Sequence, residues 1–474
     1  MTAACLVLAA SPARAGTFSP PVHLPGQANL TEWHVAVNDS GEGAAVRGSI
    51  TGEEVYPVST AGTPGSPIEV AMPRPCCQLP ASIAISRDGH VALGVTYFDG
   101  TSEEPYCTEH CGWGCCAQVA VASWRLGQPP PSVAQTIRQN VPSSEPHQIV
   151  REPVLVVGPG ALTMLWVRAD TLAESEEREV ESDNDPKPNE TQLEEAYARF
   201  GEPLHVKRLV TVPKGIYRLH LSLAADGTPV ASWIEDGNKL ASARGAPDGD
   251  LSGQMHVRFM PKLTLVQGFG FAPFDEDTLI YASNIPRHQQ SWLMLMTSSA
   301  GQWLSPPRRL GTIQQAVKHH LRAQEDPEVE AKAARRGQSS LAVWVRTFPF
   351  GSCCGQEHLH VRRGTISGHL GPAQTLGLGD ALQGAFIDEH GRSVIIYRQL
   401  TRHSHGTFSG ETFAVTALPG HRFGRPVALL PHHHCEPTVT VRGLQEPIVA
   451  ISPNGHAIIP LDCENADYLV GYTP

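Results

Sequence analysis

The chain has 474 residues, of which 18% are charged and 6% aromatic, with 44 glycines and 40 prolines. Low charge, many turn-forming residues and few long amphipathic runs are typical of an all-β protein. Most of the net charge of -11 lies in residues 170–195, where eleven acids and two bases give -9. The remainder is therefore close to neutral, which excludes a broad basic surface for binding nucleic acid.

The first fifteen residues form a short apolar run that ends in Ala13-Arg14-Ala15. This pattern predicts a signal peptide over residues 1–15, with cleavage after Ala15. No other segment approaches the ~20 apolar residues needed to span a bilayer. We therefore expect no transmembrane segment and a secreted, periplasmic or cell-surface location, with residues 16–474 forming a single domain.

One phrase recurs along the mature chain: an apolar run, a turn with glycine, and a second apolar run. The stretch Ile83–Leu93 matches Ile448–Ile459 in this way, and both contain a tight Gly turn. Self-similarity at a period of about 40–60 residues with such turns predicts a β-propeller. The phrase marks the first two strands of a blade at residues 34–48, 82–97, 153–167, 217–233, 262–281, 383–397 and 447–461.

A weaker eighth copy pairs an expected first strand within 326–336 with a plain second strand at 340–345. Eight blades follow from the full count, and seven if this copy is not a blade. The surrounding residues, about 313–336, are rich in Ala, Glu, Lys, Arg and Gln, so an inserted helix is the alternative there. Trp166, Trp233 and Trp344 end second strands, and we expect them to pack between blades.

The two ends of the chain are expected to share one blade. Residues 17–24 resemble the outer-strand phrases at 302–310 and 422–429, with proline at positions that an edge strand tolerates. The last blade would end on a third strand near residues 466–472. The N-terminal strand would then complete the C-terminal blade, which removes a free sheet edge and closes the ring. We expect a monomer.

The Gly turns carry a family resemblance. Ser86-Arg87-Asp88-Gly89 resembles a degenerate Asp box of the sialidase-like (BNR-repeat) propellers, whose motif is Ser-x-Asp-x-Gly-x-x-Trp. The phrase here lacks one spacer residue. The resemblance implies a propeller fold. Sialidases also use an arginine triad, a Tyr–Glu nucleophile pair and an acidic Asp, but no motif in this chain places those residues.

Ten cysteines remain after cleavage, an even number that indicates disulfides in an exported protein. The strand order assigns all of them to the loops of one face, which we call the loop face: Cys76, Cys77, Cys107, Cys111, Cys115, Cys116, Cys353, Cys354, Cys435 and Cys463. The simplest pairing joins Cys435 to Cys463. Cys353 pairs with Cys354 or with a distant partner. The six cysteines between 76 and 116 allow fifteen pairings, which stay open.

A metal is the alternative use of this loop face. Cys and His are soft and borderline ligands that suit Zn or Cu, and His432, His433 and His434 precede Cys435 directly. His403 and His405 lie in another loop of that face, and His110 and Trp113 lie within the Cys-rich loop. We take His110, Trp113, His403 and His405 as candidate ligand-binding residues, since exposed aromatic rings favour binding sites. No cofactor is otherwise predicted.

The acidic segment, about residues 170–198, is predicted to be a solvated loop insertion, because like charges repel and few apolar residues are present. The chain contains no P-loop, no Gly-x-Ser-x-Gly elbow and no His-Glu-x-x-His motif. We therefore expect an exported, non-catalytic binding propeller that presents a disulfide-braced face to a glycan, peptide or protein. The alternatives are a sialidase-like glycoside hydrolase or lyase, and a metalloprotein.

Overall fold

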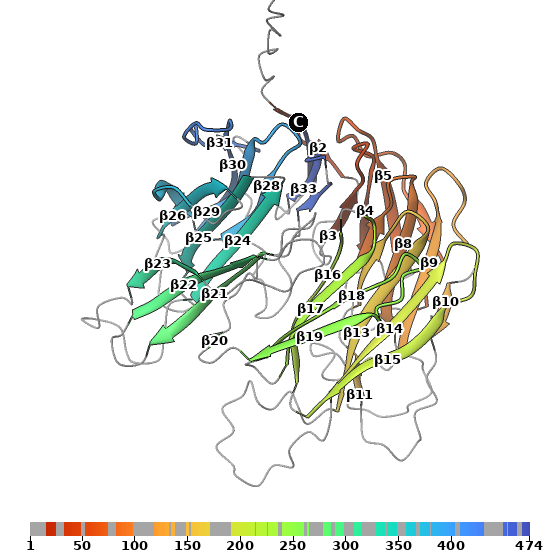
Figure 1. Cartoon of the computed structure of the whole chain (residues 1–474). Helices are drawn as coiled ribbons and strands as arrows, with labels where there is room; N and C mark the ends of the chain where they lie inside the picture. The colour runs from red at the N-terminus through yellow and green to blue at the C-terminus, as the bar shows by residue number, and fades with distance from the viewer. Residues whose placement is uncertain are drawn as a thin grey trace, which may run out of the picture.

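The computed structural model is all-β (Figure 1). It describes residues 16–24, 33–48, 53–73, 82–97, 118–131, 134–137, 148–150, 153–170, 191–213, 215–224, 226–235, 239–259, 263–264, 278–285, 290–297, 308–314, 328–336, 339–347, 357–365, 370–379, 381–402, 408–430, 449–452, 454–461 and 467–474. Over these ranges the strands form eight antiparallel sheets, which we number I to VIII.

Sheets I to IV follow one another in the first half of the chain. Their strands pair in chain order, except that β11 and β12 of sheet III both pair with β13. Sheet I contains β3 (Trp33–Val37), β4 (Gly43–Gly48), β5 (Glu53–Val58) and β6 (Ile68–Val70); sheet II contains β7 (Ser82–Ile85), β8 (His90–Tyr97), β9 (Gln118–Arg125) and β10 (Gln135–Ile137); sheet III contains β11 (Gln148–Val150), β12 (Val154–Val157), β13 (Ala161–Asp170), β14 (Thr191–Arg199) and β15 (His205–Val212); sheet IV contains β16 (Ile216–Leu223), β17 (Pro229–Glu235), β18 (Lys239–Arg244) and β19 (Gln254–Phe259).

The second half repeats the pattern. Sheet V contains β20 (Leu263–Thr264), β21 (Thr278–Ile285), β22 (Gln290–Thr297) and β23 (Arg308–Gln314); sheet VI contains β24 (Glu328–Arg336), β25 (Ser339–Thr347), β26 (Glu357–Thr365) and β27 (Gln374–Gly379); sheet VII contains β28 (Ala381–Ile387), β29 (Ser393–Arg402), β30 (Phe408–Ala417) and β31 (Val427–Ala428); sheet VIII contains β32 (Ala450–Ile451), β33 (Ala457–Leu461) and β34 (Tyr468–Thr473), with β1 (Thr17–Phe18) and β2 (Val22–His23).

The N-terminal strands pair with the C-terminal strand, as predicted. Thr17 lies opposite Thr473 in the β1–β34 ladder, and Val22 lies opposite Leu469 in the β2–β34 ladder. The backbone N–H of Leu24 also donates to the carbonyl of Asp467. The pairing covers the edge of β34 and joins the two ends of the chain in one sheet.

The core lies between neighbouring sheets rather than inside one large layer. Separate clusters of buried apolar side chains fill the interfaces I–II, II–III, III–IV, VI–VII, VII–VIII and VIII–I of the described residues. Trp166 packs between sheets II and III, and Trp233 packs between III and IV. Trp344 is half-buried and stacks on His360 of the adjacent strand, with 5.6 Å between ring centroids, and its packing between blades stays a prediction.

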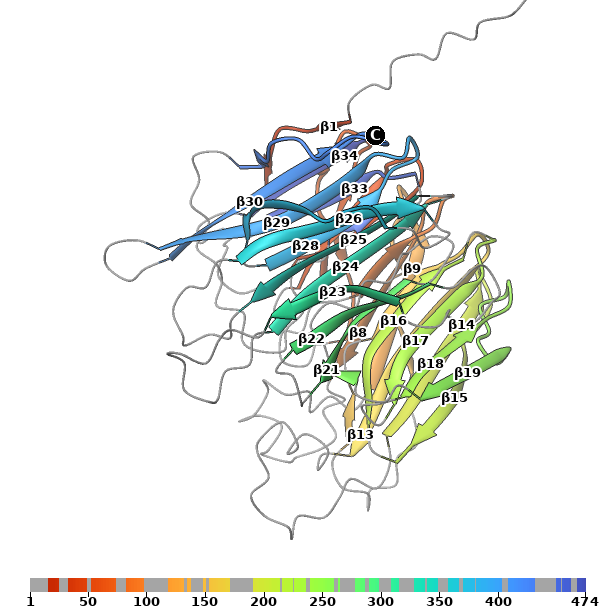
Figure 2. The ribbon, with the colours of Figure 1, turned by 60° about the vertical axis from the view of Figure 1, so that its left-hand side comes forward.

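The sheets lie side by side in chain order (Figures 1 and 2). The red to yellow-green sheets of the first half stand on one side of Figure 1, and the green to blue sheets of the second half stand on the other. The two groups meet where β3 of sheet I contacts β32 and β33 of sheet VIII. The first strands of successive sheets also contact each other, for example β24 with β28.

Two predicted insertions are shorter than expected. Residues Glu328–Arg336, where a helix was the alternative, form strand β24. The acidic insertion was predicted to run to about residue 198, and this was wrong at its C-terminal end: Thr191–Arg199 form β14, a central strand of sheet III. Residues 171–190 and 315–327 lie outside the described residues.

Candidate functional site

Five of the turns between the first and second strands of the sheets are built alike. In each of the five, the first residue of the turn donates its backbone N–H to the carbonyl four positions on, and the glycine three positions on donates its N–H back to the carbonyl of that first residue. The glycines have φ between 75° and 85°, a conformation that side chains with a Cβ rarely adopt. These inner turns begin at Asn38, Ser86, Ala224, Asp388 and Ser452.

In four of these turns the first side chain braces the loop. Asn38, Ser86, Asp388 and Ser452 each accept a hydrogen bond from the backbone N–H four residues later, at 2.9–3.0 Å. In the Asp-box-like sequence, Ser86 accepts this bond from His90 and also donates its hydroxyl to Asp88 at 2.5 Å. These contacts show that the repeated phrase serves the turn geometry.

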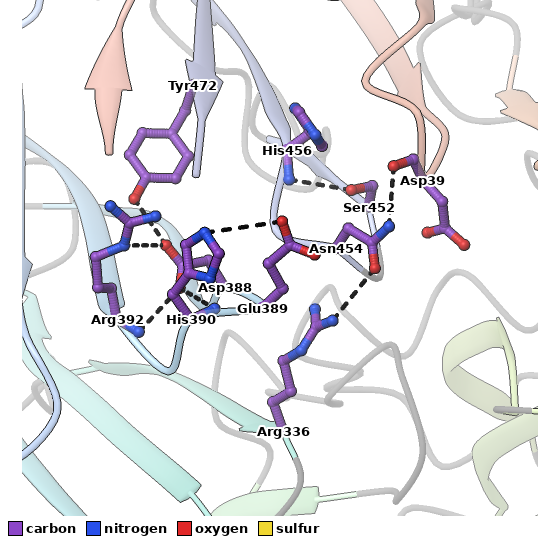
Figure 3. A network of polar contacts seen from close by, with 10 residues as sticks. All are labelled: Asp39, Arg336, Asp388, Glu389, His390, Arg392, Ser452, Asn454, His456 and Tyr472. Carbon is purple, nitrogen blue, oxygen red and sulfur yellow. Dashed lines mark hydrogen bonds and ion pairs between the residues drawn. The ribbon is translucent and has the colours of Figure 1, made fainter. Parts of the chain in front are cut away.

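Asp388 ties two sheets together at the inner turns (Figure 3). It is fully buried, and its Oδ2 accepts from Arg392 Nε at 2.6 Å and from the Tyr472 hydroxyl at 3.0 Å. Burial, aided by the nearby Asp388 carboxylate, raises the pKa of Tyr472. A Cβ on Gly455 would lie 2.3 Å from Asp388 Cβ, so the β32–β33 turn packs directly on the β28–β29 turn.

Beside this anchor lies a group of four polar residues from sheets I, VI and VIII: Asp39, Arg336, Asn454 and His456, which we call the inner-turn cluster. Asn454 donates its Nδ2 to the Asp39 carbonyl at 3.1 Å, and its Oδ1 accepts from Arg336 Nη2 at 3.3 Å. Figure 3 shows Asp39 and Arg336 approaching Asn454 from two sides. The side-chain amide of Asn454 thus joins segments of sheets I, VI and VIII that are far apart in the chain.

Three atoms of the inner-turn cluster are buried without a hydrogen-bond partner: Asp39 Oδ1, Arg336 Nη1 and His456 Nδ1. Burial lowers the pKa of His456, opposed by Glu389 and Asp39, so its imidazole is neutral at pH 7. Burial also raises the pKa of Asp39, opposed by the charge of Arg87, by a hydrogen bond with the backbone of Asn454 and by the charge of Arg336. Buried polar atoms are normally paired, so three unpaired atoms from three sheets make this cluster a candidate site.

A second buried polar group lies at the opposite end of the sheets. Glu53, the first residue of β5, is fully buried, and neither carboxyl oxygen has a hydrogen-bond partner. Burial raises its pKa to about 8. The hydroxyl of Tyr97, the last residue of β8, is also buried and unpaired.

The ladder pairing relates these groups to each other. His34 pairs with Val46, and Val46 pairs with Val55, so the three side chains share one face of sheet I. Glu53 lies two residues before Val55 and points to the same side, toward the I–II interface in which Tyr97 packs. Burial lowers the pKa of His34 to about 4, so this interface holds a neutral imidazole and a protonated carboxyl at pH 7.

Two glutamates assigned to the acidic insertion are in fact buried. Glu194 accepts from Trp166 Nε1 at 2.6 Å and pairs with Arg168 Nε at 3.1 Å. Glu195 accepts from the Leu251 backbone N–H at 2.7 Å, and burial raises its pKa to about 7. The cause of the error is visible in the sequence, since Leu193, Ala196 and Ala198 give β14 the apolar content of a central strand.

The candidate residues taken from the sequence lie outside the described residues: Cys76, Cys77, Cys107, His110, Cys111, Trp113, Cys115, Cys116, Cys353, Cys354, His403, His405, His432, His433, His434, Cys435 and Cys463. The segments that carry them join strands whose adjoining ends lie at the Glu53 end of the sheets. In the part of the chain that the structure describes, no group of three or more His, Cys, Asp or Glu is placed to hold a metal. No helix there is long and apolar enough to cross a membrane.

Comparison with known proteins gives structural likenesses. No family model matches the chain, and no curated protein matches its sequence. The WD40 domain of SCAP from fission yeast matches over 96% of this chain and 98% of its own, with 9% identity and a TM-score of 0.46. The polysaccharide lyase Uly1 matches over 98% and 94%, with 10% identity and a TM-score of 0.42.

An α-L-arabinanase from Penicillium chrysogenum, solved with arabinobiose, matches over 83% of this chain and 92% of its own, with 10% identity and a TM-score of 0.35. All three TM-scores are below 0.5, so the description of the fold rests on the strand pairing given above.

Proposed function

We propose that this protein is an exported, closed eight-bladed propeller that binds a glycan at the inner-turn cluster without catalysis. Eight successive antiparallel sheets, the pairing of the two chain ends and the contact between sheets VIII and I support the closed ring. The observation that carries the ligand site is the set of three unpaired buried atoms on Asp39, Arg336 and His456.

The chemistry of these atoms favours hydroxyl groups. Asp39 Oδ1 is an acceptor, Arg336 Nη1 is a donor, and His456 Nδ1 is either, according to its tautomer. A hydroxyl both donates and accepts, and a sugar offers several at adjacent positions. The charges of Arg87 and Arg336 are offset by those of Asp39 and Glu389, so a neutral sugar suits the cluster better than a strongly charged ligand.

The predicted signal peptide and the ten cysteines complete the proposal. Disulfides would brace the loop face at the Glu53 end, which could then contact a further stretch of the glycan or a protein that carries it. Export supplies the oxidising compartment in which such bonds form. The ring itself would be monomeric.

Binding to a glycan array, followed by titration calorimetry with the strongest neutral glycan, tests this proposal. Arg336→Gln removes the charge and the guanidinium group. We expect the affinity for the glycan to fall at least tenfold, which is about 1.4 kcal/mol of binding free energy. Arg244→Gln is the matched control, because Arg244 pairs with Asp226 beside an inner turn of sheet IV but lies outside the inner-turn cluster. An array without hits, or equal affinities of both variants, would contradict the proposal.

Glu53 favours a second candidate function, a glycoside hydrolase or lyase. A carboxyl with a pKa of about 8 is protonated at neutral pH, which is the state that a general acid requires. If Glu53 is that acid, Glu53→Gln abolishes release of reducing ends or unsaturated products from a polysaccharide panel. Wild-type activity then falls as the pH rises through about 8. If the wild-type protein releases no products from any polysaccharide of the panel, this candidate function is contradicted.

A further inference from the structure

A turn of sheet VII is docked on the outer strands of sheet VI. It comprises residues 418–426, joins β30 to β31, and is called the outer turn below. The side-chain amide of Gln374 on β27 donates to the Phe423 carbonyl at 3.4 Å and accepts from the Phe423 N–H at 3.1 Å. The Phe423 ring is buried in the VI–VII interface. Contacts with sheet VI therefore fix the position of the outer turn.

Arg363 of β26 is half-buried against the outer turn. Its Nη2 donates to the Leu418 carbonyl at 2.9 Å, and its Cζ lies 5.5 Å from the centroid of the Phe423 ring. Its Nη1 is buried and has no hydrogen-bond partner. Burial lowers the pKa of Arg363, and no carboxylate among the described residues pairs with it. Since arginine stays protonated at pH 7, the outer turn covers a positive charge that has a donor without an acceptor.

Another arginine of this protein shows what is missing at Arg363. Arg47 lies over the Trp33 ring, with 5.7 Å to the centroid, and also pairs with Glu54 at 2.8 Å. Arg363 has the same kind of aromatic contact without the carboxylate. Because taking a charge out of water is unfavourable unless the charge is paired, the site at Arg363 favours an anion supplied by a ligand.

The outer turn adds positive charge beside Arg363. Arg422 directly precedes Phe423, and Arg425 follows it by two residues. Both side chains are exposed, and neither forms an ion pair with the described residues. Residues 418–426 contain no Asp or Glu. In a chain with a net charge of -11, three arginines without carboxylate partners at one turn give a local positive potential that attracts anions.

We propose that Arg363 and the outer turn bind a tetrahedral oxyanion, a sulfate or phosphate group esterified to a sugar. Nη1 of Arg363 and the remaining N–H of its Nη2 would hold two oxygens in parallel hydrogen bonds. Arg422 and Arg425 would approach the other oxygens from the turn. A tetrahedral group suits cations from two sheets better than a planar carboxylate, because its oxygens point in more directions. The site shares no residue with the inner-turn cluster, so the inference does not rest on the proposed function.

Titration calorimetry with glucose 6-sulfate, glucose 6-phosphate and glucose tests the inference. We expect at least one ester to bind at least tenfold more tightly than glucose, with an affinity that falls as salt is added. The ester that binds more tightly shows whether the group is a sulfate or a phosphate. Arg363→Gln should lower the affinity at least tenfold. Arg363→Lys should recover only part of it, because an ammonium group lacks the planar fork.

Arg47→Gln is the matched control, because Arg47 has a similar ring contact but already pairs with a carboxylate. This variant should bind the ester as wild type does. Arg363 also holds the outer turn in place, so Arg422→Gln serves as a second variant that removes only an exposed charge. We expect it to weaken binding severalfold, and thermal melting of each variant checks that it is folded.

The inference is overturned if neither ester binds more tightly than glucose. It is also overturned if Arg363→Gln and Arg422→Gln both retain the affinity of Arg47→Gln. Arg336→Gln should leave ester binding unchanged, which separates this outcome from that of the inner-turn cluster.

Discussion

At the scale of single residues, the notable feature is a set of polar atoms that the fold buries and leaves unpaired. Asp39, Arg336 and His456 contribute one atom each at the inner turns, and Glu53 contributes two oxygens at the other end. Each such group costs free energy to bury, typically ~1–3 kcal/mol. Burying several such atoms without partners lowers the stability of the fold, and for this reason we place the functional proposals at these residues.

The burial of Glu53 predicts how stability changes with pH. Its pKa rises from 4.5 to about 8 on folding, so the folded state holds a proton that the unfolded state releases. This contribution to stability is present below pH 4.5 and is lost as the pH rises toward 8, on the order of 1 kcal/mol per pH unit. Glu53→Gln removes the titration. We therefore expect the variant to gain stability relative to wild type between pH 5 and 8.

Urea unfolding of both proteins at pH 5, 6, 7 and 8 measures this difference. The counterpart is Glu54→Gln on the same strand, whose carboxylate pairs with Arg47 near the surface. That variant should show no comparable gain. If wild type and Glu53→Gln differ by the same amount at every pH, then Glu53 is not buried in its protonated form.

At the scale of elements, the sequence predicted the parts that local chemistry determines. The Gly turns at Gly41, Gly89, Gly227 and Gly455 require positive φ, so the hairpins around them were found from the sequence. The extent of β14 was missed because Glu194 and Glu195 look like solvated charges, whereas Arg168, Trp166 and Lys207 neutralise or bind them from other strands. Contacts between strands distant in sequence decide such cases.

The anchor at Asp388 gives a prediction about how two elements are joined. Asp388→Asn keeps the shape of the turn but leaves the buried Arg392 without its counter-charge, which we expect to cost about 3 kcal/mol of unfolding free energy. Asp226→Asn breaks the more exposed Asp226–Arg244 pair of an equivalent turn and should cost less than about 1 kcal/mol. Urea unfolding measures both. Equal losses would show that Asp388 does not hold the β28–β29 turn to Tyr472.

At the scale of the whole molecule, repetition made the all-β class and the pairing of the two chain ends predictable. Function was not predictable in the same way. The sequence pointed to cysteine and histidine motifs, because those residue types stand out in a linear reading. The inner-turn cluster has no motif, since Asp39, Arg336 and Asn454 come together only when sheets I, VI and VIII are placed side by side.

A crystal structure of the mature protein with the strongest neutral glycan from the array would test the closed ring and the glycan site together. We expect eight sheets in a closed ring, with sugar hydroxyls within hydrogen-bond distance of Asp39 Oδ1, Arg336 Nη1 and His456 Nδ1. A glycan bound elsewhere, with these three atoms paired to protein groups, would contradict it.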